Sequence, residues 1–105
     1  MAAPPVLTEA QRKDALEKAA HARRVRAELK ERLKMGSVEL SQVLELADRD
    51  DIVGKTKALA VIESLPGVGK VKARRMMEEI GIADSRRLRG LGEQQRAALL
   101  AAVGG

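Results

Sequence analysis

The chain has 105 residues, with 20 Lys and Arg against 15 Asp and Glu, a formal net charge of +5 and a sequence pI near 10.0. This length fits one small domain with an appendage, and the charge favours polyanionic partners such as nucleic acid. Because the chain has no Cys, Phe, Tyr or Trp, its composition excludes disulfides, thiolate metal sites and the aromatic base stacking that single-strand binders usually use.

The N-terminal third is predicted to be a tail followed by one long helix. Residues 1–7 include two prolines and are expected to form a flexible tail. Thr8 and Gln11 have capping-box spacing, so the helix is expected over residues 8–36, with a glycine at its end.

The apolar stripe of this helix is mostly alanine in its first half. Alanine buries little area, so we expect the first half to project while Val25, Leu29 and Leu33 dock on the domain. Acidic residues precede basic residues or histidine by four positions at several places, which supports an exposed helix by about 0.3 kcal/mol per pair. These pairs are Glu9–Lys13, Asp14–Lys18, Glu17–His21 and Glu28–Arg32.

Residues 37–105 are expected to form a compact bundle of short helices. Ser37 is predicted to cap the first of them, and the acidic run over residues 48–51 is predicted to end it. The glycine at position 54 marks a turn before the next helix, which is expected over residues 56–64.

Two further helices and a short helical turn are predicted in the C-terminal part. The helices are expected over residues 69–80 and 93–103, and Asp84 or Ser85 is predicted to cap a helical turn over residues 86–89. The buried residues expected in the first of these helices are Val71, Met76, Met77 and Ile80. No segment alternates as a strand does, so the predicted fold class is all-α.

The segment Leu65-Pro66-Gly67-Val68-Gly69-Lys70 is predicted to bind an anion. Glycine permits positive backbone dihedrals and leaves the main chain bare, so amides can approach a phosphate closely. The amides after the second glycine form the free end of the next helix, where the peptide dipoles add positive charge. Lys70 and Lys72 add full charges, while Val68 is expected to wedge inward. A tight helix-to-helix turn with no ligand is the alternative interpretation.

A second glycine pair, Gly90 and Gly92, follows three arginines. The planar guanidinium groups of Arg86, Arg87 and Arg89 suit phosphate because each can donate two hydrogen bonds at once. A solvated charged surface is the alternative for this segment.

Most of the excess positive charge lies behind the first glycine pair. Residues 1–64 hold 12 basic and 11 acidic residues, whereas residues 65–105 hold 8 basic and 4 acidic residues. Lys55 and Lys57 are expected to reach flanking phosphates, although solubility explains them almost as well. The cluster of Arg23, Arg24 and Arg26 on the long helix fits DNA contact and solvated surface equally well.

These motifs resemble a known family. Residues 65–73 are similar to the helix-hairpin-helix signature of non-specific DNA-binding proteins, and residues 85–92 extend the match to the helix-two-turns-helix variant. The whole chain resembles the actinobacterial integration host factor family, in Leu7-Thr8, Ala15–Ala20, Arg26–Glu28, Arg32–Lys34, Ile52–Lys55 and Glu63–Lys70.

The resemblance implies a small helical monomer of the nucleoid that binds and shapes double-stranded DNA with little sequence preference. It also implies assistance to phage integrase and contact with nucleoid enzymes such as topoisomerase, with no cofactor. We expect the DNA contacts at Lys55, Lys57, Gly67, Val68, Gly69, Lys70, Lys72, Arg75, Ser85, Arg86, Arg87, Arg89, Gly90 and Gly92.

A base-excision glycosylase is the enzymatic alternative, because those enzymes carry the same hairpin. Their lyase members have a catalytic lysine two places after the second hairpin glycine, where this chain has Val71. A flipped base also needs a pocket that is normally lined by aromatic residues, and this chain has none. We therefore expect no catalytic and no metal-binding residues.

Two non-enzymatic alternatives stay open. A ribosomal or RNA-binding protein would use the same two-turn element, although this chain lacks a long basic tail and stacking residues. The long helix would otherwise serve to recruit a protein partner. No apolar run approaches the roughly 20 residues that span a bilayer and no signal pattern opens the sequence, so we expect a cytoplasmic protein without membrane contact.

Overall fold

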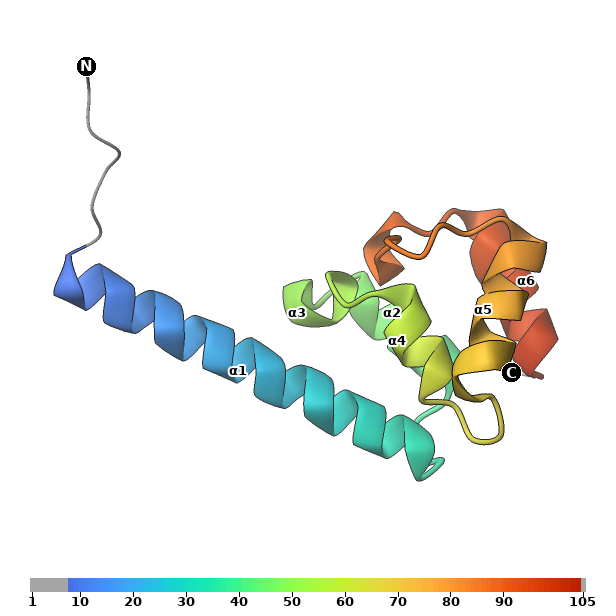
Figure 1. The fold of residues 1–105 in the computed structure, drawn as a ribbon, viewed down its shortest axis with the longest axis horizontal. Coiled ribbons are helices and arrows are strands. Elements are labelled where there is room, and N and C mark those ends of the chain that lie inside the picture. The colour runs from blue at the N-terminus through green and yellow to red at the C-terminus, as the bar shows by residue number, and fades with distance from the viewer. Residues whose placement is uncertain (1–7, 105) are drawn as a thin grey trace, which may run out of the picture.

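The computed structural model describes residues 8–104, and its regular structure is helical. A long helix α1 (Glu9–Lys34) is followed by α2 (Leu40–Ala47), α3 (Asp51–Gly54), α4 (Ala58–Glu63) and α5 (Gly69–Ile80), then by a 3-10 helix η1 (Leu88–Gly90) and α6 (Glu93–Val103). Figure 1 shows α1 as an arm that extends away from a body formed by the other elements. The all-α prediction is confirmed, and no helix in the described residues is both long and apolar enough to cross a bilayer.

Helix α1 begins as its sequence predicts. The Thr8 hydroxyl accepts a hydrogen bond from the Gln11 amide at 3.1 Å, and the Gln11 side chain accepts one from the Thr8 amide at 3.0 Å. These two bonds satisfy amides that the first helical turn leaves free. The tail predicted over residues 1–7 lies outside the described residues.

The other end of α1 explains why Ser37 does not cap the second helix. Gly36 adopts a φ of +73°, and the amides of Gly36 and Ser37 donate to carbonyls of the last turn of α1 at 3.1 and 3.0 Å. Ser37 thus closes α1 in a Schellman motif. Glu39 is the N-cap of α2, and its amide donates to the side chain of Gln42 at 2.9 Å.

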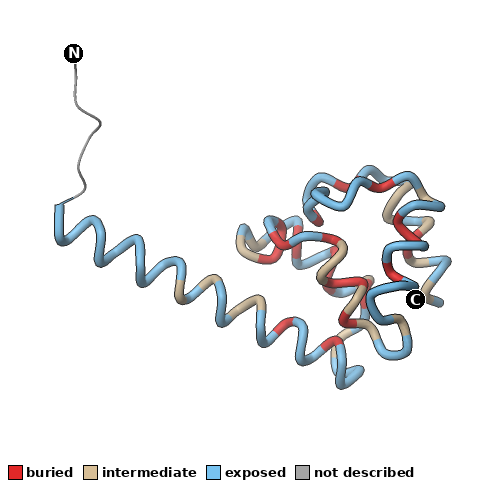
Figure 2. Tube along the Cα trace, in the orientation of Figure 1, coloured by how far each residue is buried: buried red, intermediate tan, exposed pale blue. Residues whose placement is uncertain are grey.

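The first half of α1 projects from the body, as predicted. Leu16 is 62% exposed, whereas Leu29 and Leu33 are buried and Val25 is half-buried (Figure 2). Among the predicted acid-base pairs, the described residues form only the one between Asp14 and Lys18, at 3.1 Å. The burial of two leucines therefore stabilises the docked half of α1, whereas interactions within the helix stabilise the projecting half.

The core lies between the docked end of α1 and the short helices of the body. Its largest fully buried side chains include Leu33, Leu40, Ile62, Met77, Leu88 and Leu99. Burying side chains of this size contributes roughly 1.5–3 kcal/mol each. The prediction that Val71 joins this core is wrong, because Val71 is 75% exposed. It lies about 120° around α5 from Met77 and so points away from the buried stripe.

The acidic run over residues 48–51 does more than end α2. The Asp50 carboxylate accepts hydrogen bonds from the amides of Ile52 and Val53 at 2.9 and 3.1 Å and so caps the short helix α3. Gly54, predicted to mark a turn, is the last residue of that helix. The next helix, α4, begins two residues later than predicted, with Lys57 as its N-cap.

Candidate nucleic-acid interface

The turn between α4 and α5 has the backbone conformation that its glycines predict. Gly67 and Gly69 adopt φ values of +76° and +71°, where other residues are strained by about 1–2 kcal/mol. Helix α5 begins at Gly69, and within residues 8–104 the amides of Gly69, Lys70 and Val71 donate no backbone hydrogen bond. All three residues are exposed. Three free amides therefore face solvent at the positive end of a helix dipole, which suits phosphate.

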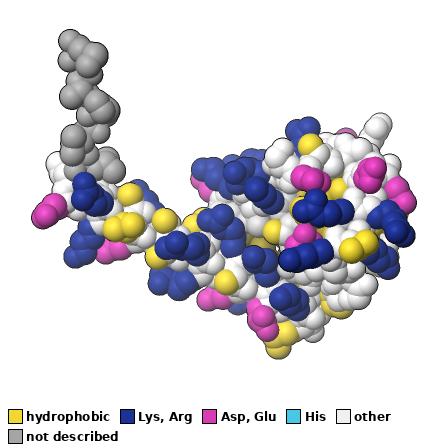
Figure 3. Space-filling view, viewed as in Figure 1, with side chains coloured by type: hydrophobic (Ala, Val, Ile, Leu, Met, Phe, Trp, Pro, Cys, Tyr) yellow, Lys and Arg dark blue, Asp and Glu magenta, His cyan; other side chains and the backbone are white. Residues whose placement is uncertain are grey.

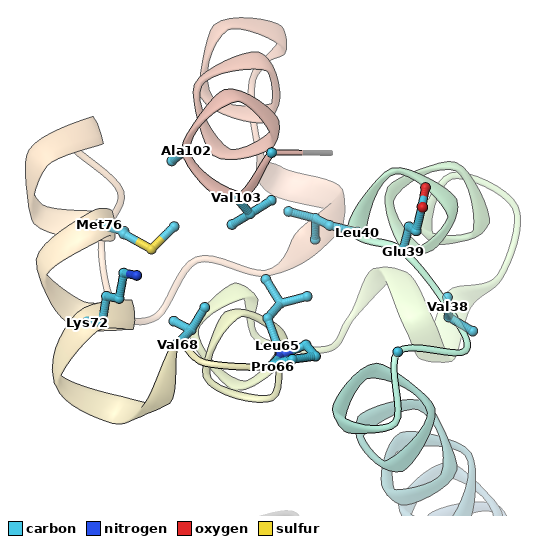
Figure 4. Close-up of a pocket in the computed structure, with 12 residues that line it drawn as sticks. Val38, Glu39, Leu40, Leu65, Pro66, Val68, Lys72, Met76, Ala102 and Val103 are labelled. Atoms are coloured by element: carbon cyan, nitrogen blue, oxygen red, sulfur yellow. The ribbon is translucent and has the colours of Figure 1, made fainter.

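Val68 points to the inner side of this turn, as predicted. Its half-buried side chain packs against the hydrophobic core and borders a pocket of about 320 Å³ together with Leu65, Met76 and Val103 (Figure 4). Lys72 also lines this pocket. Val68 thus faces the body of the protein, whereas the three residues that carry the free amides are exposed.

The predicted basic residues of α5 leave the helix in different directions. Lys72 lies about 200° around the helix from Lys70, so the two side chains diverge. Arg75 is one turn after Val71 and shares its outward face, whereas Arg74 is paired with Asp84 at 3.3 Å. The outer surface at this end of α5 therefore carries Lys70 and Arg75, and Lys72 stands at the pocket.

Backbone pairing brings together the basic residues around the second glycine pair and those before α4. These residues, Lys55, Lys57, Arg86, Arg87 and Arg89, are called the second cluster below. Two hydrogen bonds of 2.9 and 3.0 Å join residues 56–58 to residues 86–88 and place Lys57 opposite Arg87 in an isolated antiparallel bridge. Because this pairing keeps the backbone at Arg87 extended, the helical turn predicted over residues 86–89 begins two residues later than expected. It is the 3-10 helix η1, whose first residue, Leu88, is buried.

Neither residue proposed as a cap for this segment acts as one. The N-cap of η1 is Arg87, and no side chain makes a capping hydrogen bond there. Asp84 instead pairs with Arg74, and Ser85 is exposed.

The second cluster surrounds a shallow depression of about 510 Å³. Its lining includes Lys55, Ser85, Arg86, Arg87, Arg89 and Gly90. Arg87 donates a hydrogen bond to the carbonyl oxygen of Lys55, and Arg86 donates one to the carbonyl oxygen of Gly90 at 3.4 Å. The contact between Arg87 and Lys55 brings together basic residues from two segments that are about 30 residues apart in the sequence.

The second glycine pair differs from the first. Neither Gly90 nor Gly92 has a positive φ. Gly92 is the N-cap of α6, and its amide already donates to the side chain of Gln95 at 3.0 Å. Gly92 therefore lacks both the positive φ and the free amide that the first turn offers to a phosphate.

Arg26 lies beside the second cluster, a placement that was not predicted from the sequence. A groove between α1 and α3 is lined by Arg26, Lys55 and Arg87 together with Ala22, Ile52 and the acidic Asp51. In the sequence, Arg26 stands close to Arg23 and Arg24, which are both exposed. The available signal was its spacing of three and seven residues from the docked leucines at positions 29 and 33, which places Arg26 on their face.

Acidic residues pair with two C-terminal arginines besides Arg74. Asp48 accepts two hydrogen bonds from Arg96 at 2.9 and 3.0 Å, and this contact lowers the pKa of Asp48 from its ordinary 3.8. Asp51 lies 2.8 Å from Arg89, whose hydrogen bond likewise lowers the pKa of Asp51. Arg89 is therefore already paired within the protein.

The two clusters lie at opposite ends of α4. This helix has six residues and is about 9 Å long, so the clusters suit separate phosphate groups. Figure 3 shows Lys and Arg side chains spread over α1 and the body on one face of the molecule. Within residues 8–104, no group of three or more His, Cys, Asp or Glu side chains is placed to hold a metal ion.

Comparison with known proteins gives consistent matches over most of the chain. A family model described as the S13-like H2TH domain matches residues 33–103. The chain is 59% identical over 100 residues to the integration host factor of Mycobacterium tuberculosis, with 95% of each chain covered. It is 56% identical over 99 residues to that of Streptomyces coelicolor, covering 94% of this chain and 92% of the relative. A solved structure described as sIHF bound to an 8bp palindromic DNA has 52% sequence identity and a TM-score of 0.81, over 84% of this chain and 99% of that one.

Proposed function

This chain belongs to the actinobacterial integration host factor family, and on that premise we propose that it binds the phosphate backbone of double-stranded DNA with little sequence preference. The observation that carries the proposal is the set of free amides at the start of α5, held outward by two glycines with positive φ. A related structure was solved with DNA, which agrees with this assignment.

The binding surface has two contact points in this proposal. The amides of Gly69 to Val71 and the side chain of Lys70 hold one phosphate, with Arg75 beside them. Lys55, Lys57, Arg86 and Arg87 hold others at the far end of α4. Both points contact backbone rather than base edges, so they position the protein without reading sequence.

No chemistry accompanies this binding in the proposal. Val71 stands where a lyase would carry its lysine, and an exposed valine has no proton to transfer or nucleophile to offer. We infer a nucleoid protein that acts as a monomer, shapes the DNA it binds, and assists phage integrase or nucleoid enzymes such as topoisomerase through that shape.

Comparative binding tests the proposal. Double-stranded DNA, single-stranded DNA and structured RNA of equal length are titrated side by side with the full chain. Tighter binding to several unrelated duplexes than to both other ligands supports the proposal. Preference for the structured RNA favours the ribosome-type alternative, to which the S13-like description of the domain also points. A strong preference for one duplex contradicts backbone recognition.

A further inference from the structure

We propose that Arg89 is a positioning residue rather than a phosphate contact, and that its ion pair with Asp51 holds the second cluster in its DNA-binding arrangement. This inference rests on the proposed function. It changes the role that the sequence suggested for Arg89, which was grouped there with Arg86 and Arg87.

The Arg89 guanidinium is held by two acceptors from different helices. One is the carboxylate of Asp51 in α3, at 2.8 Å. The other is the carbonyl oxygen of Ala47 at the end of α2, at 3.4 Å. Within the described residues, that carbonyl accepts no backbone hydrogen bond. A cation at the C-terminal end of a helix is favourable because the last carbonyls are unpaired and carry partial negative charge.

A glycine makes room for this arrangement. A Cβ atom at Gly54 would lie 2.9 Å from the Arg89 Nε atom and 2.6 Å from the carbonyl oxygen of Ala47. Gly54 has no positive φ, so its backbone does not require glycine. Arg89 and the end of α2 both lie so close to Gly54 that a side chain at this position would clash with them.

The contacts of Arg89 with Asp51 and Ala47, called the brace below, act directly on the residues of the second cluster. Arg89 follows the buried Leu88 in η1, and the backbone just before it pairs with residues 56–58. Tying Arg89 to α2 and α3 therefore fixes the segment that presents Arg86 and Arg87 beside Lys55. The ion pair is substantially exposed, with 45% of the Arg89 side chain and 76% of the Asp51 side chain accessible, and such pairs contribute little to stability. We therefore place its effect in the geometry of binding.

The change in DNA affinity on replacing Asp51 with alanine distinguishes a positioning role of Arg89 from a phosphate contact, because the two roles predict changes in opposite directions. The change removes one negative charge near DNA, so it should strengthen binding if Arg89 is then released to hold a phosphate. If Arg89 is a brace, affinity falls by about two- to fivefold, the most that an exposed pair of this kind can contribute. Asp84→Ala is the matched control, because it removes an equal charge and releases Arg74 from a similar exposed pair.

A second variant changes Arg89 instead of Asp51, so that the test does not depend on whether α3 still folds without its first residue, Asp51. Arg89→Lys preserves the charge, but a single ammonium group cannot reproduce the two-acceptor contact of the guanidinium. The brace predicts that Arg89→Lys binds about as weakly as Arg89→Ala, and that adding Asp51→Ala to Arg89→Ala weakens binding no further. The melting temperatures should stay close to that of the unmodified protein.

The outcomes separate this inference from the function on which it rests. Absence of salt-dependent duplex binding by the unmodified chain defeats the proposed function itself. If that chain binds but Asp51→Ala binds as tightly as Asp84→Ala or more tightly, the brace is refuted and the function stands. Full affinity in Arg89→Lys, with loss only in Arg89→Ala, also refutes the brace.

Discussion

Replacing Gly69 with alanine is expected to destabilise the protein by about 1–2 kcal/mol. A Cβ atom at this position would meet no atom within 4 Å, so the effect comes from the strained φ of +71° and not from a clash. In a domain of this size, the loss corresponds to a decrease in Tm of roughly 5–15 °C. Gly92→Ala is the matched control: its φ is −74° and its nearest neighbour would lie 3.8 Å away. It should change stability by less than about 1 kcal/mol.

Thermal denaturation followed by circular dichroism measures this difference, and duplex binding below both melting temperatures measures its consequence. Gly69→Ala keeps every charge, so any loss of affinity reports the geometry of the amides. Loss of one hydrogen bond to a charged group corresponds to about a tenfold decrease in affinity. Equal stability of the two variants would refute the role of the left-handed conformation. Unchanged affinity of Gly69→Ala would refute phosphate binding by the amides.

Three further results are expected. Leu33→Ala should lower the free energy of unfolding in urea by about 2–5 kcal/mol, because the side chain is fully buried where α1 docks; a loss below about 1 kcal/mol would contradict that docking. Arg86→Ala should weaken binding to all duplexes about equally and reduce the salt slope by about 0.9, and a sequence-selective loss would contradict a phosphate contact. The hydrogen bonds from Arg96 lower the pKa of Asp48, so the stabilisation from this pair is present above the ordinary value of 3.8 and is lost as pH falls through the lower folded-state value. Thermal denaturation between neutral and acidic pH should show this loss, and Asp48→Asn should reduce it. An unchanged acid dependence in Asp48→Asn would contradict the contribution of the Arg96 pair.

The sequence predicted the elements whose signals are local. The bounds of α5 and α6 agree with the predicted ranges of 69–80 and 93–103, because regular apolar spacing and nearby glycines act within a few residues. Gly36 and Gly81 end their helices with φ values of +73° and +87°, as the placement of a glycine after an apolar stripe predicts.

Errors arose where one residue type suits two local roles. Ser37 can cap a helix or complete the turn after one, and the position of Gly36 decides for the second role. Val71 is apolar but lies off the stripe formed by Ala73, Met76 and Met77, so stricter use of the helical period would have excluded it from the core.

The features that depend on distant contacts could not be read from the sequence. The bridge between Lys57 and Arg87 joins segments that are separated by two helices. The pairing of Asp51 with Arg89 requires α3, a helix that was not predicted. Composition and spacing identified which residues are basic. Only the fold distinguishes the cations that are open to a ligand from those that are paired within the protein.

The most direct test of backbone binding is the salt dependence of affinity for unrelated duplexes. Each phosphate contact contributes about −0.9 to the slope of log K against log salt concentration. The cations that form the two proposed contact points are Lys55, Lys57, Lys70, Arg75, Arg86 and Arg87, and contact by most of them predicts a common slope between about −4 and −5. A slope near zero, or slopes and affinities that differ strongly from one duplex to another, would contradict the account.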